Sequence, residues 1–154
     1  MSERQVYIHY GANKFDEKKF APIKNEPGFS KPRGGLWCSR VDAEYGWIDW
    51  CQDEGYRISR LNKCFKFHIK ENANIVRINN MNDIHNLCDG VETQKLFGKK
   101  FAIDFESMAN RGVDAIELCT VGCIGVDIEY WDTVYGWDCQ SMVIFNPDII
   151  EVIE

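Results

Sequence analysis

The chain has 154 residues, of which 45% are apolar and 13% aromatic, and its formal net charge at pH 7 is −6. This length and apolar content predict a single domain, residues 1–154, with one sizeable core. The acidic balance argues against nonspecific binding to nucleic acid, although the Lys and Arg residues between Arg57 and Lys70 are compatible with a local basic groove.

The cysteines and the hydropathy pattern indicate a cytoplasmic protein. The sequence contains seven cysteines, an odd number without the regular spacing of a disulfide framework. No signal peptide is recognisable, and no apolar run approaches the ~18 residues of a membrane span, so no membrane partner is expected. Cys119 and Cys123 have a spacing found in zinc sites, but without a second pair we interpret them as structural and expect no metal.

The first predicted elements are two strands separated by a long loop. The alternation in Val6–Tyr10 predicts a strand with His9 inside it, on the same face as Tyr7. A loop with three prolines follows and closes at Gly34 and Gly35, and Leu36–Ser39 is predicted as the second strand. Whether His9 is a structural histidine or a ligand-binding one is open on these residues alone.

An aromatic-rich helix is predicted next. Asp42 is a plausible N-cap for a helix over Ala43–Glu54, and Gly55 is a suitable C-terminal stop. Trp47 and Trp50 share one face of this helix. At that spacing they are either core residues or walls of a binding site.

The rest of the chain contains more strands than helices and no regular βαβ alternation. This pattern predicts an α+β fold with a mainly antiparallel sheet and a few short helices. The expected strands are Cys64–Lys70, Ile75–Ile78, Asp114–Thr120, Asp127–Trp131, Gln140–Phe145 and Ile149–Ile153. The expected short helices are Asn82–Cys88 and Asp104–Arg111.

Common catalytic motifs are missing from the sequence. It contains no phosphate-binding loop, no dinucleotide-binding Gly-x-Gly-x-x-Gly and no Gly-x-Ser-x-Gly elbow. His68 and His85 fall on predicted polar faces and are interpreted as solvated. The acids near predicted strands, which are Glu117, Asp127 and Glu129, are expected to be solvated as well.

Three segments together resemble the motifs of the ADP-ribosyltransferase fold, in its poly(ADP-ribose)-polymerase-like and diphtheria-toxin-like branch. They are His9 before Gly11, the run Gly35-Leu-Trp-Cys-Ser39 with Tyr45 after it, and the late strand that begins near Asp138. The chain is also similar to small uncharacterised bacterial and phage proteins assigned to this fold. The match covers about the first fifty and last twenty residues, and it implies a split antiparallel sheet.

The resemblance implies that NAD is bound as a substrate and that ADP-ribose is passed to a protein or nucleic-acid acceptor. In that reading His9 binds the adenosine-side ribose and Tyr45 is the platform for the nicotinamide ring. Gln140, or else Ser141, stands where the family carries a glutamate; we take Gln140, with Asp138 nearby. The candidate catalytic residues are therefore His9, Tyr45, Gln140 and Asp138. The implied NAD-binding residues are His9, Tyr10, Gly11, Gly35, Leu36, Trp37, Ser39, Tyr45 and Trp47.

Two other functions are left open. Gln140 is neutral, so it stabilises the positive charge of bond breaking less well than a glutamate. This favours a non-catalytic nucleotide- or protein-binding module on the same fold. A relative of the RNA 2′-phosphotransferases, which also use NAD, ranks lower because basic residues are not evident near the motifs.

Overall fold

The computed structural model describes residues 3–26, 31–80, 82–83, 93–96, 99–119, 137 and 139–153. In these residues a seven-stranded sheet has the order β4-β7-β8-β2-β1-β3-β9, and every neighbouring pair except β4 and β7 is antiparallel. The strands are β1 (Tyr7–Tyr10), β2 (Leu36–Arg40), β3 (Cys64–Ile69), β4 (Ile75–Ile78), β7 (Ala115–Leu118), β8 (Ser141–Ile144) and β9 (Ile150–Val152).

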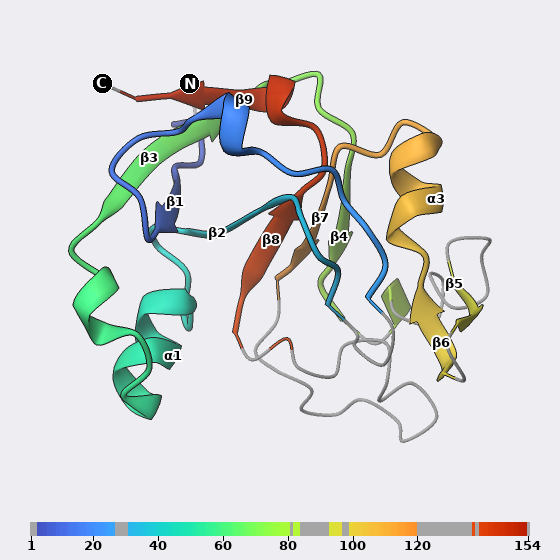
Figure 1. Cartoon of the computed structure of the whole chain (residues 1–154), viewed down its shortest axis with the longest axis horizontal. Coiled ribbons are helices and arrows are strands. Elements are labelled where there is room, and N and C mark those ends of the chain that lie inside the picture. Colours follow the sequence, from blue (N-terminus) through green and yellow to red (C-terminus); the bar gives the residue numbers. More distant parts are fainter. Residues whose placement is uncertain are drawn as a thin grey trace.

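A smaller sheet and short helices complete the described structure (Figure 1). The two-stranded sheet consists of β5 (Thr93–Leu96) and β6 (Lys99–Ile103). The helices are α1 (Trp47–Glu54) and α3 (Phe105–Asn110), and the 3₁₀ turns are η1 (Glu17–Lys19), η2 (Ile58–Arg60) and η4 (Pro147–Ile149). The predicted α+β fold with a mainly antiparallel sheet and few short helices is therefore confirmed.

Most predicted elements agree with the structure to within two residues, because their apolar alternation corresponds to real burial. In β3, for example, Phe65 and Phe67 are buried while Lys66 is exposed. The strand predicted at 127–131 and most of the helix predicted at 82–88 lie outside the described residues. None of the described helices is both long and apolar enough to cross a membrane.

The start of α1 was predicted four residues too early. The helix begins at Trp47, its N-cap is Gly46, and the Asp49 carboxylate accepts the Gly46 N–H at 2.8 Å. Tyr45 stands outside the helix because its backbone N–H and C=O both bond to Gln140, each at 2.8 Å. Hydrogen bonds to Gln140, a residue far away in the sequence, thus hold Tyr45 outside the helix that local propensity predicts.

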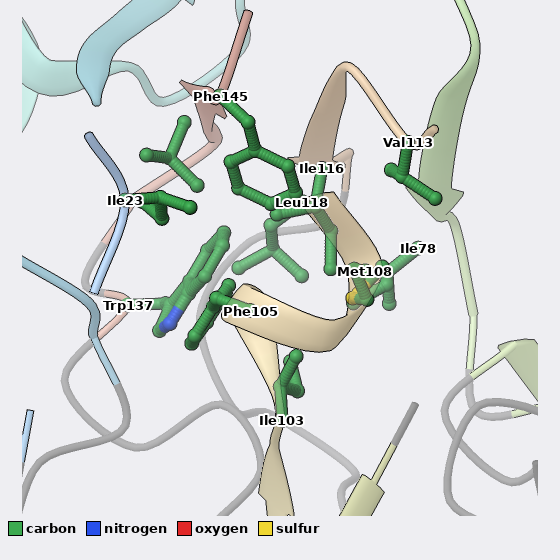
Figure 2. Packing of buried hydrophobic residues seen from close by; sticks show 11 residues of the cluster. Ile23, Ile78, Ile103, Phe105, Met108, Val113, Ile116, Leu118, Trp137 and Phe145 are labelled. Atoms are coloured by element: carbon green, nitrogen blue, oxygen red, sulfur yellow. The ribbon is translucent and has the colours of Figure 1, made fainter. Parts of the chain in front are cut away.

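One hydrophobic cluster lies between the sheet and α3. Phe105 stacks on Trp137 with ring centroids 6.5 Å apart and meets Phe145 edge to face at 6.1 Å. Figure 2 shows these rings beside Ile116 and Leu118 of β7. The other buried members of this first cluster are Ile23, Ile78, Ile103, Met108, Val113 and Val143.

A second cluster lies on the opposite face of the sheet. Met142 and Ile144 of β8 belong to it, whereas Val143 between them belongs to the first cluster. All four residues of β8 are buried, because both faces of this central strand are covered. The remaining buried members of the second cluster are Tyr7, Cys38, Phe65, Phe67, Ala115 and Ile149.

The paired glycines before β2 are required by the packing. Gly34 and Gly35 have φ angles of 76° and 68°, in the left-handed region that favours glycine. A Cβ at Gly34 would overlap the Pro22 carbonyl, and one at Gly35 would lie 2.7 Å from the Ile144 carbonyl oxygen. The chain can therefore enter β2 against β8 only with glycine at these positions.

The pairing between β1 and β2 is the shortest in the seven-stranded sheet. The two strands share only two residue pairs, Tyr7 with Arg40 and Ile8 with Ser39. Beyond Ile8, β1 continues to pair with β3, and Leu36–Cys38 pair with β8. The two strands therefore separate in the middle of the sheet, and this opening is where the site lies.

Candidate functional site

A cavity of about 300 Å³ lies where β1 and β2 separate. It combines residues from both strands, from α1, from the turn around η2 and from the start of β8. The described lining residues are Ile8, His9, Tyr10, Gly11, Lys31, Trp37, Cys38, Trp47, Arg57, Arg60, Leu61, Cys139 and Ser141. Five of the predicted site residues, His9, Tyr10, Gly11, Trp37 and Trp47, are thus brought together around one cavity.

His9 bridges the opening between the strands. Its Nδ1 lies 2.6 Å from the Trp37 carbonyl oxygen, and its ring centroid is 5.2 Å from that of Phe65. A carbonyl only accepts hydrogen bonds, so Nδ1 carries the proton and Nε2 is the acceptor of the neutral ring. Burial lowers the pKa of His9 below 6.5, only partly offset by the Trp37 hydrogen bond. His9 is therefore neutral at pH 7.

Two tryptophans from different elements line the cavity. Trp37 on β2 meets Trp137 edge to face, with centroids 5.1 Å apart, and Lys31 Nζ lies 5.6 Å from the Trp37 ring centroid. Trp47 on α1 stacks on Trp50 at 5.2 Å and 19°. Trp37 and Trp50 therefore have different roles. Trp37 packs on the first cluster and also lines the cavity, whereas Trp50 supports Trp47 from outside it.

The charged groups at the cavity are basic. Lys31, Arg57 and Arg60 line it, and none of the described lining residues is acidic. Arg57 and Arg60 belong to the basic cluster that the sequence shows between residues 57 and 70. A local basic surface therefore exists in an acidic protein, and it is combined with aromatic rings.

Gln140 has a structural role that the sequence does not reveal. Its Oε1 accepts the Tyr45 N–H at 2.8 Å, and its Nε2 donates to the Cys119 carbonyl at 2.8 Å. Its own carbonyl accepts the Ser39 hydroxyl at 2.8 Å, and Ser39 Oγ also accepts the Trp47 N–H at 3.1 Å. Gln140 and Ser39 thus fix the start of α1 and do not line the cavity.

The other predicted site residues within the described ranges also lie away from the cavity lining. The Tyr45 hydroxyl donates to Asp53 at 2.7 Å, and this bond raises the pKa of Tyr45 to about 12. Leu36 packs on the second cluster and Gly35 forms the turn before β2. Asp138 lies outside the described residues. Of the three candidate catalytic residues that the structure describes, His9, Tyr45 and Gln140, only His9 lines the cavity.

Glu117 is a buried charged residue that the sequence predicted to be solvated, and that prediction is wrong. Its side chain is 4% exposed and accepts two hydrogen bonds from Arg40, at 2.9 and 3.0 Å, and one from Arg77 at 3.0 Å. The Tyr7 hydroxyl lies 3.4 Å from Oε1. Side chains alternate along β7, so Glu117 lies on the same face as Ala115. The sequence of this short strand does not show that this face is buried.

The environment of Glu117 determines its ionisation. Burial would raise the pKa of this carboxyl, but the hydrogen bonds and charges of Arg40 and Arg77 outweigh burial and lower it below 4.5. A second cavity of about 160 Å³ lies beside this cluster, lined in part by Arg40, Asp42 and Glu44. Every polar atom of the Glu117 carboxylate already has partners, so the cluster is best explained as a structural ion-pair network.

Comparison of the chain with protein-family models, with curated proteins and with solved structures gives no match. In the described part of the chain no group of three or more His, Cys, Asp or Glu side chains is arranged to hold a metal ion. The site therefore has to be interpreted from its own geometry.

Proposed function

We propose that the chain is a binding module for a nucleotide-class ligand, whose flat heteroaromatic ring occupies the cavity between β1 and β2. The observation that carries this proposal is the lining of one 300 Å³ cavity by Tyr10, Trp37 and Trp47. Small-molecule sites typically have volumes of about 300–1,000 Å³. The cavity is thus large enough for a base or nicotinamide ring with its sugar, and the rest of a dinucleotide would extend outside it.

The chemistry of the lining supports this ligand class. Stacking on an aromatic side chain contributes about 0.5–1.5 kcal/mol beyond area burial. His9 presents a neutral ring with Nε2 as a hydrogen-bond acceptor, suited to a hydroxyl or amide N–H of the ligand.

Substitution of Trp47 tests the proposal with the least risk to the fold. Trp47 is partly exposed, whereas Trp37 packs on the first cluster. We expect Trp47→Ala to weaken binding of NAD or AMP by roughly two- to tenfold in isothermal titration calorimetry. The matched control is Trp50→Phe, which keeps an aromatic ring against Trp47 and leaves the cavity lining unchanged, and should stay within about twofold. If neither ligand, nor nicotinamide riboside, binds the native protein at millimolar concentration, the proposal fails.

NAD-dependent ADP-ribosyl transfer to a protein or nucleic-acid acceptor is a second candidate. It is supported by the convergence of His9, Trp37 and the start of β8 at one cavity, which the family resemblance predicts. Cleavage of the nicotinamide–ribose bond develops positive charge that a nearby carboxylate would stabilise. The described lining includes no carboxylate, and the Gln140 amide is bonded elsewhere. Binding without transfer is therefore the better supported function.

The two candidates differ in nicotinamide release. We expect the protein to bind NAD without releasing nicotinamide, with or without a cell lysate as acceptor source. Gln140→Glu should not create activity, because its side chain is held by Tyr45 and faces the Cys119 carbonyl. The matched control is Gln52→Glu on the exposed side of α1. Nicotinamide release by the native protein would establish the transferase in place of the binding module.

A further inference from the structure

We propose that the ligand carries a diphosphate group and that Arg57 and Arg60 are the residues that select it. This inference rests on the proposed function and names the ligand class of the same cavity. It predicts that the site prefers nucleoside diphosphates, including dinucleotides, over nucleoside monophosphates and unphosphorylated nucleosides.

The pairing of the arginines in the chain is the first argument. Arg4 pairs with Glu151 at 2.8 Å, Arg33 pairs with Glu26, and Arg40 and Arg77 share Glu117. In the described part of the chain, Arg57 and Arg60 form no ion pair, although the net charge is −6. Two guanidinium groups without a carboxylate partner thus line the same cavity.

The local backbone places these two side chains together. Arg57 is the N-cap of η2 and Arg60 its last residue, and the Arg60 N–H bonds to the Arg57 carbonyl at 2.9 Å. Both residues stand on this one short turn, and both line the same cavity. Both side chains are exposed, so each retains guanidinium donors for an anion. Two such forks at one cavity offer more donors than a single phosphate group needs, and a diphosphate has acceptor oxygens for both.

Arg57 is held in an unfavourable backbone conformation. Its φ and ψ are 49° and 33°, and among the described residues it is the one non-glycine residue with positive φ. The left-handed region is strained for a residue with a Cβ, and Gly55, two residues earlier, adopts a similar φ of 64°. The Arg57 guanidinium lies 5.0 Å from the Tyr56 ring centroid, which restricts its orientation. A strained arginine at the edge of a cavity indicates a use for its side chain.

The position of Lys31 agrees with this arrangement. It lies on the Trp37 side of the lining, with Nζ near that ring, whereas the arginines come from the turn after α1. A ligand with its ring in the cavity would therefore have basic groups from two separate segments of the chain beside it. The arginines, with fixed planar donors, are better suited than a lysine to distinguish a diphosphate from a single phosphate.

The test is calorimetry on the full chain with two ligand series: adenosine, AMP and ADP, and nicotinamide riboside, nicotinamide mononucleotide and NAD. In the series whose ring the cavity accepts, we expect the diphosphate to bind roughly tenfold more tightly than the monophosphate, since charge-assisted hydrogen bonds are the strong ones. Arg57→Gly and Arg60→Gln should each reduce diphosphate affinity by about tenfold and leave nucleoside affinity within about twofold.

Two controls separate this effect from general charge and from unfolding. Lys63→Gln removes one positive charge beside the turn without touching the cavity lining, and should change every affinity by less than about twofold. Arg57→Gly relieves the positive-φ strain, so its Tm should equal or exceed that of the native protein. A loss of diphosphate affinity in this variant then cannot be attributed to a damaged fold.

The outcomes distinguish the two proposals. If nucleoside and diphosphate of one series bind with equal affinity, or if Arg57→Gly and Arg60→Gln behave like Lys63→Gln, the diphosphate inference is overturned and the binding function stands. If no member of either series binds, both proposals fail.

Discussion

The buried carboxylate of Glu117 is compatible with folding only because Arg40 and Arg77 accompany it. We expect Glu117→Gln to lower the free energy of unfolding by about 2–4 kcal/mol, because both guanidinium groups lose their charged partner. Urea unfolding at pH 7 measures this change. The matched control is Glu151→Gln, whose partner Arg4 is 40% exposed, and which should cost less than about 1 kcal/mol. Equal losses in the two variants would contradict the role assigned to Glu117.

The same carboxylate predicts a specific pH dependence. The pKa of Glu117 in the folded state lies below 4.5, because the arginines outweigh the effect of burial. A depressed pKa contributes stability that is complete above the unfolded pKa and is lost as the pH falls through the folded one. The stability difference between the native protein and Glu117→Gln should therefore be constant from pH 7 to 5 and shrink at lower pH. A difference that grows on acidification would be inconsistent with this assignment.

His9 predicts a dependence in a higher pH range. Burial lowers its pKa below 6.5, so the folded state binds fewer protons than the unfolded state as the pH falls past 6.5. Above pH 6.5 the His9 ring is neutral in both states and costs no stability. As the pH falls below 6.5, protonation of His9 in the unfolded state lowers the free energy of unfolding. This loss stops once the pH is below the pKa of His9 in the folded state. We expect Tm to fall between pH 7 and 5, and His9→Gln to remove part of that fall. His68→Gln, a change in the neighbouring strand β3, is the control and should preserve it.

At the scale of elements, the entry into β2 depends on a close approach of two backbones. Gly35 and Gly55 have similar φ angles of 68° and 64°, but only Gly35 has neighbours within reach of a Cβ. Gly55→Ala should cost about 1 kcal/mol from strain alone. Gly35→Ala should cost at least about 2 kcal/mol more, because its Cβ meets the Ile144 carbonyl. Thermal unfolding of the two variants measures the difference, and equal losses would mean that β2 can move away from β8.

Strands with one buried face could be predicted from the apolar periodicity of the sequence. The start of α1 could not, because a tertiary contact determines it. The alternation in β3 is local, so its bounds were found almost completely. The residues before Trp47 read as helix, yet Gln140, almost a hundred positions away, binds the backbone of Tyr45. The pair β5 and β6 was missed altogether, since its residues are mostly polar and lack a clear period-2 apolar pattern.

At the scale of the whole molecule, the candidate site could be predicted only in part. The sequence placed His9, Trp37 and Trp47 near one ligand, and the cavity brings these three together. It did not identify Arg57 and Arg60 as part of the site, although their cluster is visible in the sequence. What links them to His9 is the return of the chain after α1 and the pairing of β1 with β3, which is tertiary information.

The sheet separates two hydrophobic clusters, and this arrangement predicts how the molecule unfolds. Phe67 is fully buried in the cluster with Tyr7, and Phe105 is 3% exposed in the cluster with Trp137. Phe67→Leu and Phe105→Leu should each cost about 1–2 kcal/mol, because leucine fills only part of the space.

The double variant tests whether the clusters are coupled. The two phenylalanines have separate partners on opposite faces of the sheet, so their costs should add to within about 0.5 kcal/mol. The β8 strand supplies alternate residues to both clusters, so the loss of that strand disrupts both. Tryptophan fluorescence and far-ultraviolet circular dichroism should therefore report one coincident urea transition in all three variants. Two separated transitions in the Phe105→Leu variant would show instead that the α3 side of the sheet unfolds independently.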